Sequence, residues 1–386
     1  MTAGDLKFLR EALQLARRGY GATSPNPMVG AVLVRSGKVI GRGWHHRAGL
    51  PHAEIEALRD AQQRQQATRG ATLYVTLEPC CTHGRTPPCT DAIIDAGIRR
   101  VVVGTPDPNP KHAGKGLRIL RRAGIEVVAP ARRGQSADAA AINRECSRLN
   151  EAFNHWIVHR TPFVTVKAAM TLDGKIATAA GESKWITSEK ARTHSLHLRQ
   201  GSDAILVGVN TVLLDDPSLT ARQTTPHPLR RIVLDSLART PLTARVVTDA
   251  NATLTTLVVS RRAPRKRVAA LAQRVQVLVA PTTKATITSR EKPGLDLRWL
   301  LRRLGAKNVT SLLVEGGGEV NASFLLGGLA QRVAFFYAPK ILGGREARRA
   351  VAGVGAASLA EVRRLKDVEW HRLGPDLLLT ALVENA

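Results

Sequence analysis

Apolar runs typical of strands alternate with amphipathic runs typical of helices along the whole chain. In the first half, the patterns predict strands at 28–34, 38–44, 71–77, 100–103 and 125–128, and helices at 5–18, 52–66, 89–96 and 116–122. In the second half, they predict strands at 163–168, 204–207, 231–234, 254–259, 275–279, 309–314 and 332–337, and helices at 188–199, 296–304 and 319–325. Such alternation favours open sheets with helices on their faces, so we predict an α/β fold for each half.

The length of the chain indicates two domains. Its 386 residues are about twice a typical domain of roughly 100–200 residues. The segment between Pro130 and Thr161 is rich in Ala, Arg and Gln and reads as a helical connection, and Pro162 then precedes a new strand. We therefore predict domains at 1–149 and 150–386, with the boundary near Leu149.

Cysteine content and hydropathy together favour a cytoplasmic protein. Four cysteines are too few for a disulfide framework, and the closeness of Cys80, Cys81 and Cys89 favours metal binding or catalysis. No apolar run approaches the roughly 20 residues of a transmembrane helix, and residues 1–5 lack the apolar segment of a signal peptide. We expect no membrane partner.

The net charge of +26 leaves two interpretations. One is a nucleic-acid or phosphate-bearing partner attracted by the field of the protein, and the other is a bias toward Arg on a solvated surface. The arginines are scattered, and aromatic residues make up 4% of the chain, which leaves little material for stacking bases. The second interpretation is therefore favoured.

The first chemical motif has the pattern H-x-E … P-C … C. His52 and Glu54 open a predicted helix, while Cys80 and Cys89 follow a predicted strand and precede the next helix. One imidazole and two thiolates can hold Zn²⁺ with its fourth position open to water, as a catalytic zinc requires. Glu54 is two residues from His52 at the start of the helix, so it can sit beside the bound water without ligating the metal, and it is expected to carry the proton from water to the leaving amine.

This motif resembles the deaminase half of the bacterial bifunctional riboflavin-biosynthesis deaminase/reductase family. The resemblance rests on three segments, which are 26–30 (NPMVG), 52–54 (HAE) and 77–89 (LEPCCTHGRTPPC). The insert between the two zinc cysteines is longer than in the common nucleotide deaminases. The resemblance implies a cytidine-deaminase-like α/β/α domain with Zn²⁺ on His52, Cys80 and Cys89, and it leaves Cys81 unligated.

The same resemblance implies which residues contact the pyrimidine or its ribose phosphate. These contacts fall on Asn26, His45 and Arg85. Thr82 stands where the family usually has His, and His83 follows it, so His83 is expected as the substitute for that contact.

The second motif is a strand–glycine–helix element at 313–320, with glycines at 316–318. Glycines here let the backbone approach a phosphate and aim helix N–H groups at it, although a simple tight turn explains them equally well. Together with segments 166–177, 183–188 and 208–222, this element resembles the reductase half of the same family. The resemblance implies a dihydrofolate-reductase-like α/β domain that uses NADPH.

The reductase resemblance also implies two sets of site residues. The cofactor set is Ala169, Trp185, Thr211, Asp215, Ser236, Gly317, Gly318, Glu319, Val320, Asn321, Ala322 and Ser323. The substrate set is Lys167, Ser183, Arg199, Leu219, Arg222 and Glu315. Arg199 and Arg222 suit a ribose phosphate because each presents a planar fork of donors. Lys167 fits either a substrate contact or a strand-edge position.

These expectations combine into a bifunctional enzyme of riboflavin biosynthesis. Zinc-bound hydroxide would deaminate 2,5-diamino-6-(5-phosphoribosylamino)pyrimidin-4(3H)-one, and NADPH would then reduce the ribosyl group of 5-amino-6-(5-phosphoribosylamino)uracil to ribityl. We expect small phosphorylated pyrimidines as substrates, no nucleic-acid partner, and a homo-oligomer. Two rivals are a nucleic-acid base deaminase fused to a nucleotide-binding domain, and a structural zinc module fused to a regulatory one.

Overall fold

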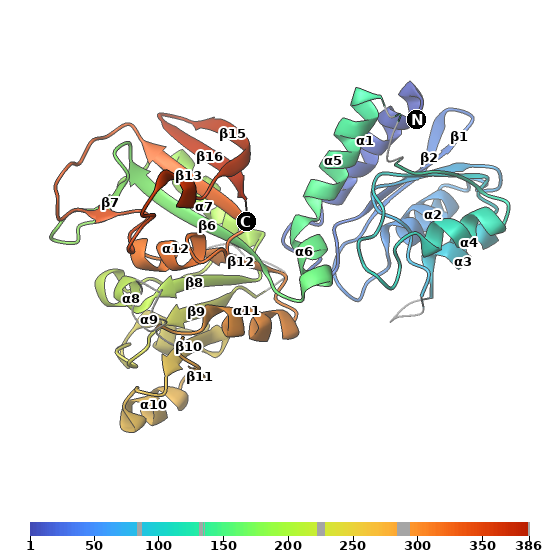
Figure 1. The fold of residues 1–386 in the computed structure, drawn as a ribbon. Coiled ribbons are helices and arrows are strands. Elements are labelled where there is room, and N and C mark those ends of the chain that lie inside the picture. Colours follow the sequence, from blue (N-terminus) through green and yellow to red (C-terminus); the bar gives the residue numbers. More distant parts are fainter. Residues whose placement is uncertain (83–86, 131–133, 135, 222–227, 284–293, 385–386) are drawn as a thin grey trace. The chain divides into compact units, whose positions relative to one another are not determined.

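The protein divides into two compact units, Met1–Arg160 and Thr161–Ala386 (Figure 1). The computed structural model describes residues 1–82, 87–130, 134, 136–221, 228–283 and 294–384. The boundary lies later than the predicted position near Leu149, because helices α5 (Ala137–Leu149) and α6 (Glu151–His159) both belong to the first unit. Between them, the Asn150 amide accepts from Met28 N at 2.7 Å and donates to Met28 O at 2.8 Å, which ties this point of the chain to the first unit.

The first unit contains a five-stranded sheet in the order β2-β1-β3-β4-β5. β1 pairs antiparallel with β2 and β3, whereas β3, β4 and β5 run parallel. The strands are β1 (Gly30–Arg35), β2 (Lys38–Trp44), β3 (Thr72–Val75), β4 (Arg100–Val103) and β5 (Glu126–Val128). The remaining helices are α1 (Ala3–Arg17), α2 (Ala53–Gln63), α3 (Cys89–Asp95) and α4 (Lys115–Arg122).

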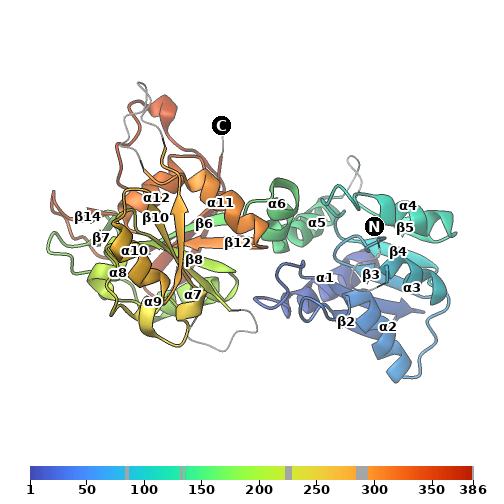
Figure 2. The ribbon, with the colours of Figure 1, turned by 90° about the horizontal axis from the view of Figure 1, so that it is seen from below.

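Alternating side chains of the first sheet enter two separate apolar cores. Ala31 and Leu33 pack with α2, α3 and α4, while Val32 and Val34 pack with α1 and α5, which lie against each other (Figures 1 and 2). This period of two is what a sheet covered on both faces requires. Gly43 of β2 lets α2 approach closely, because a Cβ there would collide with the carbonyl oxygen of Ala53. The result is a three-layer α/β/α unit with the start of α2 held against the sheet.

The second unit is built on a nine-stranded sheet in the order β11-β10-β9-β8-β12-β6-β13-β16-β15. The strands from β11 to β13 are parallel, and β16 and β15 continue the sheet antiparallel. They are β6 (Phe163–Thr171), β8 (Ala204–Gly208), β9 (Arg230–Leu234), β10 (Thr255–Ser260), β11 (Gln276–Ala280), β12 (Ser311–Val314), β13 (Arg332–Ala338), β15 (Leu365–Leu373) and β16 (Asp376–Val383). A separate two-stranded sheet pairs β7 (Lys175–Ala177) with β14 (Arg348–Arg349).

Helices cover both faces of this second sheet. They are α7 (Glu189–Gln200), α8 (Val209–Asp215), α9 (Arg245–Thr248), α10 (Arg265–Ala272), α11 (Leu297–Ala306) and α12 (Gly318–Leu325), with 3-10 turns η1 (Ala252–Leu254) and η2 (Leu359–Glu361). Leu206 of β8 packs in the core with α11 and α12, while its neighbours Ile205 and Val207 pack in the core with α8, α9 and α10. Among the described residues, no helix has the length and hydropathy needed to cross a membrane.

The sequence patterns missed several elements of the second unit, most clearly the hairpin of β15 and β16. β15 is the outer strand of the sheet, and most of its side chains are exposed. An exposed edge strand has no buried face, so it lacks the alternation of apolar and polar residues by which strands are predicted. The short helices α8, α9 and α10 were missed for a related reason, since they have few turns over which helical spacing can be read.

Candidate active sites

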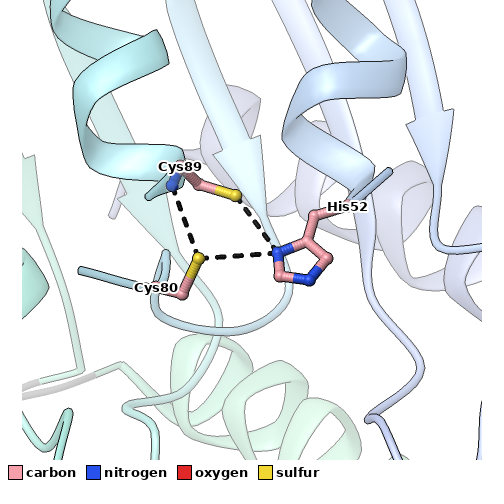
Figure 3. A group of neighbouring side chains, drawn as sticks. All are labelled: His52, Cys80 and Cys89. Atoms are coloured by element: carbon pink, nitrogen blue, oxygen red, sulfur yellow. Dashed lines mark hydrogen bonds between the residues drawn. The ribbon is translucent and has the colours of Figure 1, made fainter. Parts of the chain in front are cut away.

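Three predicted metal ligands meet where two helices begin in the first unit (Figure 3). His52 directly precedes α2, Cys89 is the first residue of α3, and Cys80 lies in the loop after β3. His52 Nδ1 is 3.3 Å from Cys89 Sγ and 3.5 Å from Cys80 Sγ, and the Cys89 backbone N–H donates to Cys80 Sγ at 3.4 Å. The three ligand atoms lie within 4.8 Å of one another.

This donor set fits Zn²⁺. One imidazole nitrogen and two sulfurs are the ligands of a zinc that keeps a position open. The Cys89 thiol, hydrogen-bonded to Cys80, lowers the pKa of Cys80 against the effect of burial, and His52 lowers it further, so a thiolate is favoured where a metal would bind. Cys81 lies outside this group, and its Sγ is 3.7 Å from His112 Nδ1.

Glu54 lies in the first turn of α2 and is 3% exposed. Burial and, to a lesser extent, the negative charge of Cys80 raise the pKa of Glu54 to about 7. A carboxyl group that changes its protonation state near neutral pH suits proton transfer.

Two of the predicted pyrimidine contacts, Asn26 and His45, lie together beside the metal ligands. The His45 and His52 rings meet edge to face with centroids 5.4 Å apart. His45 Nδ1 is 3.0 Å from the carbonyl oxygen of Pro51, which can only accept, so Nδ1 carries the proton and Nε2 accepts from Asn26 Nδ2 at 3.1 Å. Burial lowers the pKa of His45, which keeps its ring neutral. His83 and Arg85 lie outside the described residues.

Glu78 organises the loop that carries Cys80, a role that the sequence analysis did not identify. Its buried carboxylate accepts backbone N–H groups of Asp107 at 3.2 Å, Gly114 at 2.9 Å and Gly116 at 3.0 Å. These bonds tie the segment before α4 to the zinc loop. The motif E-P-C includes Glu78, but the backbone N–H groups that Glu78 binds come from a distant segment that only the fold brings close.

The second unit holds a cavity of about 840 Å³ at the carboxyl ends of its central parallel strands. It includes Gly208 at the end of β8, Leu234 at the end of β9, and Glu315 just after β12. Ligands of parallel α/β sheets bind at this edge. Many predicted reductase residues line the cavity, namely Ser183, Thr211, Asp215, Ser236, Glu315, Gly317, Gly318, Glu319, Val320 and Ser323.

Other predicted reductase residues lie elsewhere. Lys167, Ala169, Trp185 and Arg199 line a second, smaller cavity of about 160 Å³. The remaining described ones are Leu219, Asn321 and Ala322, which are buried and line neither cavity. Arg222 lies outside the described residues.

Glu315 forms the centre of a buried charge cluster. Arg199 donates to it through Nε at 2.7 Å and Nη2 at 3.1 Å, and Lys167 Nζ lies 3.4 Å from it. Burial opposes the ionisation of Glu315, but Lys167 and Arg199 outweigh it and lower the pKa of Glu315 to about 2. Lys167 is therefore part of this cluster rather than an isolated strand-edge cation.

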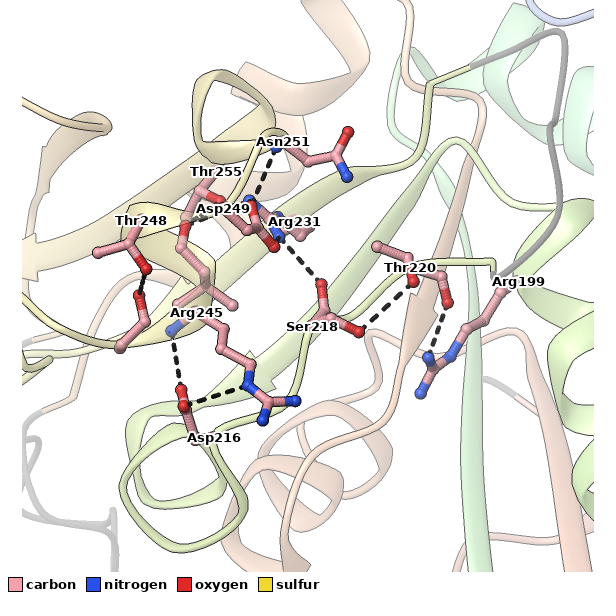
Figure 4. Close-up of polar contacts among 12 residues, drawn as sticks. Arg199, Asp216, Ser218, Thr220, Arg231, Arg245, Thr248, Asp249, Asn251 and Thr255 are labelled. Carbon is pink, nitrogen blue, oxygen red and sulfur yellow. Dashed lines mark hydrogen bonds and ion pairs between the residues drawn. The ribbon is translucent and has the colours of Figure 1, made fainter.

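Two arginines hold the loop that contains Leu219 (Figure 4). Arg199 Nη1 donates to Thr220 O at 2.9 Å, and Arg231 Nη1 donates to Ser218 O at 3.0 Å. Arg231 is 1% exposed and also forms a two-pronged ion pair with Asp249, with distances of 2.7 and 2.8 Å. The sequence analysis did not identify Arg231, because a single Arg in a strand carries no signal of a buried partner.

Both units match known protein families. Residues 3–105 match the cytidine and deoxycytidylate deaminase zinc-binding region, and residues 162–379 match the RibD C-terminal domain. The riboflavin biosynthesis protein RibD of Actinobacillus pleuropneumoniae is 41% identical over 382 residues, which cover 99% of this chain and 96% of that protein. The chain belongs to the RibD family.

Solved RibD structures share the fold of the whole chain. Acinetobacter baumannii RibD, form 1, has a TM-score of 0.82 at 34% identity and covers 99% of both chains. The diaminohydroxyphosphoribosylaminopyrimidine deaminase/5-amino-6-(5-phosphoribosylamino)uracil reductase of Thermotoga maritima has a TM-score of 0.80 at 34% identity, again over 99% of both chains. The predicted α/β class, with a cytidine-deaminase-like first domain and a RibD-type reductase second domain, is confirmed.

Proposed function

We propose that this RibD family chain catalyses two successive reactions of riboflavin biosynthesis. The first unit hydrolyses the exocyclic amine of 2,5-diamino-6-(5-phosphoribosylamino)pyrimidin-4(3H)-one, and the second reduces the ribosyl group of 5-amino-6-(5-phosphoribosylamino)uracil to ribityl. The observation that carries the proposal is the grouping of His52, Cys80 and Cys89, whose ligand atoms all lie within 4.8 Å of one another. It occurs in a chain whose second unit matches the RibD C-terminal domain.

In deamination, His52, Cys80 and Cys89 hold the metal, and Glu54 moves the proton. Zinc at this position supplies the Lewis acidity that lowers the pKa of a water molecule. The Glu54 carboxylate would accept a proton from water as the water oxygen bonds to the ring carbon, and it would deliver that proton to the amine, which leaves as ammonia when the C–N bond breaks. Asn26, held by neutral His45, orients the pyrimidine beside Glu54.

In reduction, the residues of the second unit position two ligands. NADPH supplies the hydride that reduces the sugar. Lys167, Arg199 and Glu315 together leave one positive charge beside the smaller cavity, and this charge attracts the substrate phosphate. Asp215 accepts from Ser183 Oγ at 3.2 Å and so fixes Ser183 in the wall of the larger cavity.

The proposal also covers the surroundings in which the chain works. Its partners are small phosphorylated pyrimidines rather than nucleic acids, and a site built on two cysteine thiols suits the reducing cytoplasm. The chain forms a homo-oligomer, and support comes from the unpaired outer edge of β15, where Val368 and Trp370 are exposed. Light scattering at micromolar concentration tests this, and a monomer would refute it.

A coupled assay tests both activities. The zinc-loaded protein is incubated with the diaminopyrimidine substrate, first alone and then with NADPH, and each product is identified by mass spectrometry. We expect the deaminated product without NADPH and the ribityl product only when NADPH is present. Release of ammonia from cytosine in single-stranded DNA, with no turnover of the pyrimidine phosphate, would instead favour the nucleic-acid rival.

A further inference from the structure

Two arginines without an assigned role line the larger cavity. Arg348 and Arg349 make up β14, and both side chains are exposed and line the cavity wall. In the part of the chain that the structure describes, neither guanidinium forms a hydrogen bond or an ion pair with a protein group. The Arg348 guanidinium lies over Gly181, close enough that a Cβ on that glycine would be 3.4 Å from Arg348 Nη2.

The segment that carries these arginines is fastened to the first turn of α12. Ala352 N donates to Gly318 O at 3.1 Å, and Asn321 Nδ2 donates to Ala350 O at 2.8 Å. The Arg349 carbonyl oxygen lies directly against Gly318, where a Cβ would collide with it. Arg348 and Arg349 are therefore held next to the glycine turn, on the wall of the same cavity.

Three of the four acidic side chains that line the cavity are bound to other groups. Asp215 accepts from Ser183, Asp296 accepts the Trp299 backbone N–H at 2.9 Å, and Glu315 is bound to Lys167 and Arg199. A third cavity arginine, Arg298, donates to Gly327 O at 3.0 Å. The fourth acidic side chain, Glu319, is exposed in the first turn of α12 and forms no ion pair with Arg348 or Arg349 in the described structure, so both guanidiniums remain available for an anionic ligand.

The order of the strands indicates which part of a dinucleotide these charges meet. The glycine turn follows β12, which lies between β8 and β6 in the sheet. Ser236 follows β9 on one side of this position, and Lys167 belongs to β6 on the other. A dinucleotide that spans this edge has its two nucleosides over the flanking strands and its pyrophosphate over the turn after β12.

We propose that Arg348 and Arg349 bind the pyrophosphate of the nicotinamide coenzyme against the first turn of α12. This inference rests on the proposed reductase function. Each guanidinium offers a planar fork of donors to a phosphate, and the first N–H groups of α12 have no acceptor within the helix. Two cations match the two negative charges of a pyrophosphate.

The test measures coenzyme affinity directly. Dissociation constants of NADPH and NADH are obtained by fluorescence titration for the wild type and for R348Q, R349Q and the double variant. The two coenzymes share the pyrophosphate and differ only in the 2′-phosphate. We therefore expect the double variant to weaken both by the same factor, about tenfold or more, because it loses charge-assisted hydrogen bonds.

Arg345→Gln is the matched control. Arg345 is exposed in the same segment but does not line the cavity. The Arg345→Gln protein should therefore bind both coenzymes with the affinity of the wild type. Weaker NADPH binding with unchanged NADH binding would assign the arginines to the 2′-phosphate and overturn the inference. Unchanged binding of both coenzymes would also overturn it. A wild type that binds neither coenzyme would refute the proposed reductase function itself.

Discussion

Arg199 donates two hydrogen bonds to Glu315, with Nε–Oε1 at 2.7 Å and Nη2–Oε2 at 3.1 Å. Its third nitrogen, Nη1, donates to Thr220 O. Arg199 therefore reaches the substrate site as half of a buried ion pair, not as the free phosphate-binding fork expected from its residue type. Lys167 completes the cluster and supplies its excess positive charge.

Arg199→Ala should destabilise the second unit as well as impair reduction. The substitution leaves the Glu315 carboxylate buried with one of its two cationic partners missing, and breaking such pairs costs about 3–5 kcal/mol. Urea unfolding and the reductase rate measure the two effects. Arg303→Ala, at an exposed position on α11, is the control and should change neither. Wild-type stability in Arg199→Ala would contradict the structural role of the pair.

Cys80→Ala and Cys81→Ala should differ in zinc binding and deaminase activity, although the two residues are adjacent. Cys80 belongs to the metal group, whereas Cys81 contacts His112. Cys80→Ala should lose bound zinc and deaminase activity but keep NADPH-dependent reduction of the deaminated pyrimidine. Cys81→Ala should retain zinc, as measured by elemental analysis. If Cys81→Ala lost zinc and Cys80→Ala retained it, Cys81 would be the metal ligand and Cys80 would not.

Glu54→Gln should retain zinc and lose deamination. The amide keeps the shape of the buried side chain but cannot accept the proton, and general acid–base groups contribute about 10²–10⁴ in rate. Zinc content, reductase activity and ammonia release are measured on the same sample. Full deaminase turnover in a zinc-loaded Glu54→Gln protein would refute the role of this residue.

The Asp5–Arg100 ion pair should make the first unit sensitive to acid. Burial opposes ionisation of Asp5, but hydrogen bonds from Arg100 and Thr2 outweigh it and lower the pKa of Asp5 to about 2. The pair therefore stabilises the fold above the unfolded pKa of about 3.9, by about 2 kcal/mol, and this stabilisation is lost as the pH falls toward 2.

Hydrogen exchange of α1 amides in the zinc-free protein, corrected for intrinsic rates, measures this loss. Protection in the wild type should fall between pH 4 and pH 2. Asp5→Asn should have lower protection at neutral pH and a weaker dependence on pH in the acid range. Asp95→Asn, at an exposed position on α3, should follow the wild type. Equal acid sensitivity of the wild type and Asp5→Asn would exclude this pair as its source.

Local patterns in the chain predicted most of the layered fold. Strands with an apolar residue at every second or every position, such as β1 and β8, are recognisable because each buries one or both faces. The pattern failed for β15, which buries no face, and for the domain boundary, which depends on the contact of Asn150 with Met28. Neither feature leaves a periodic signal.

The sequence by itself determined the zinc chemistry, because His52, Glu54, Cys80 and Cys89 combine residue types and helix-start positions that few other functions require. Only the tertiary structure decided how the charged residues are used. Arg199, Arg231 and Arg348 are the same residue type, yet their surroundings differ. Arg199 is paired with Glu315, Arg231 is buried and paired with Asp249, and Arg348 lines a cavity. The partner of a charge comes from another segment of the chain, so its role depends on which segments the fold brings together.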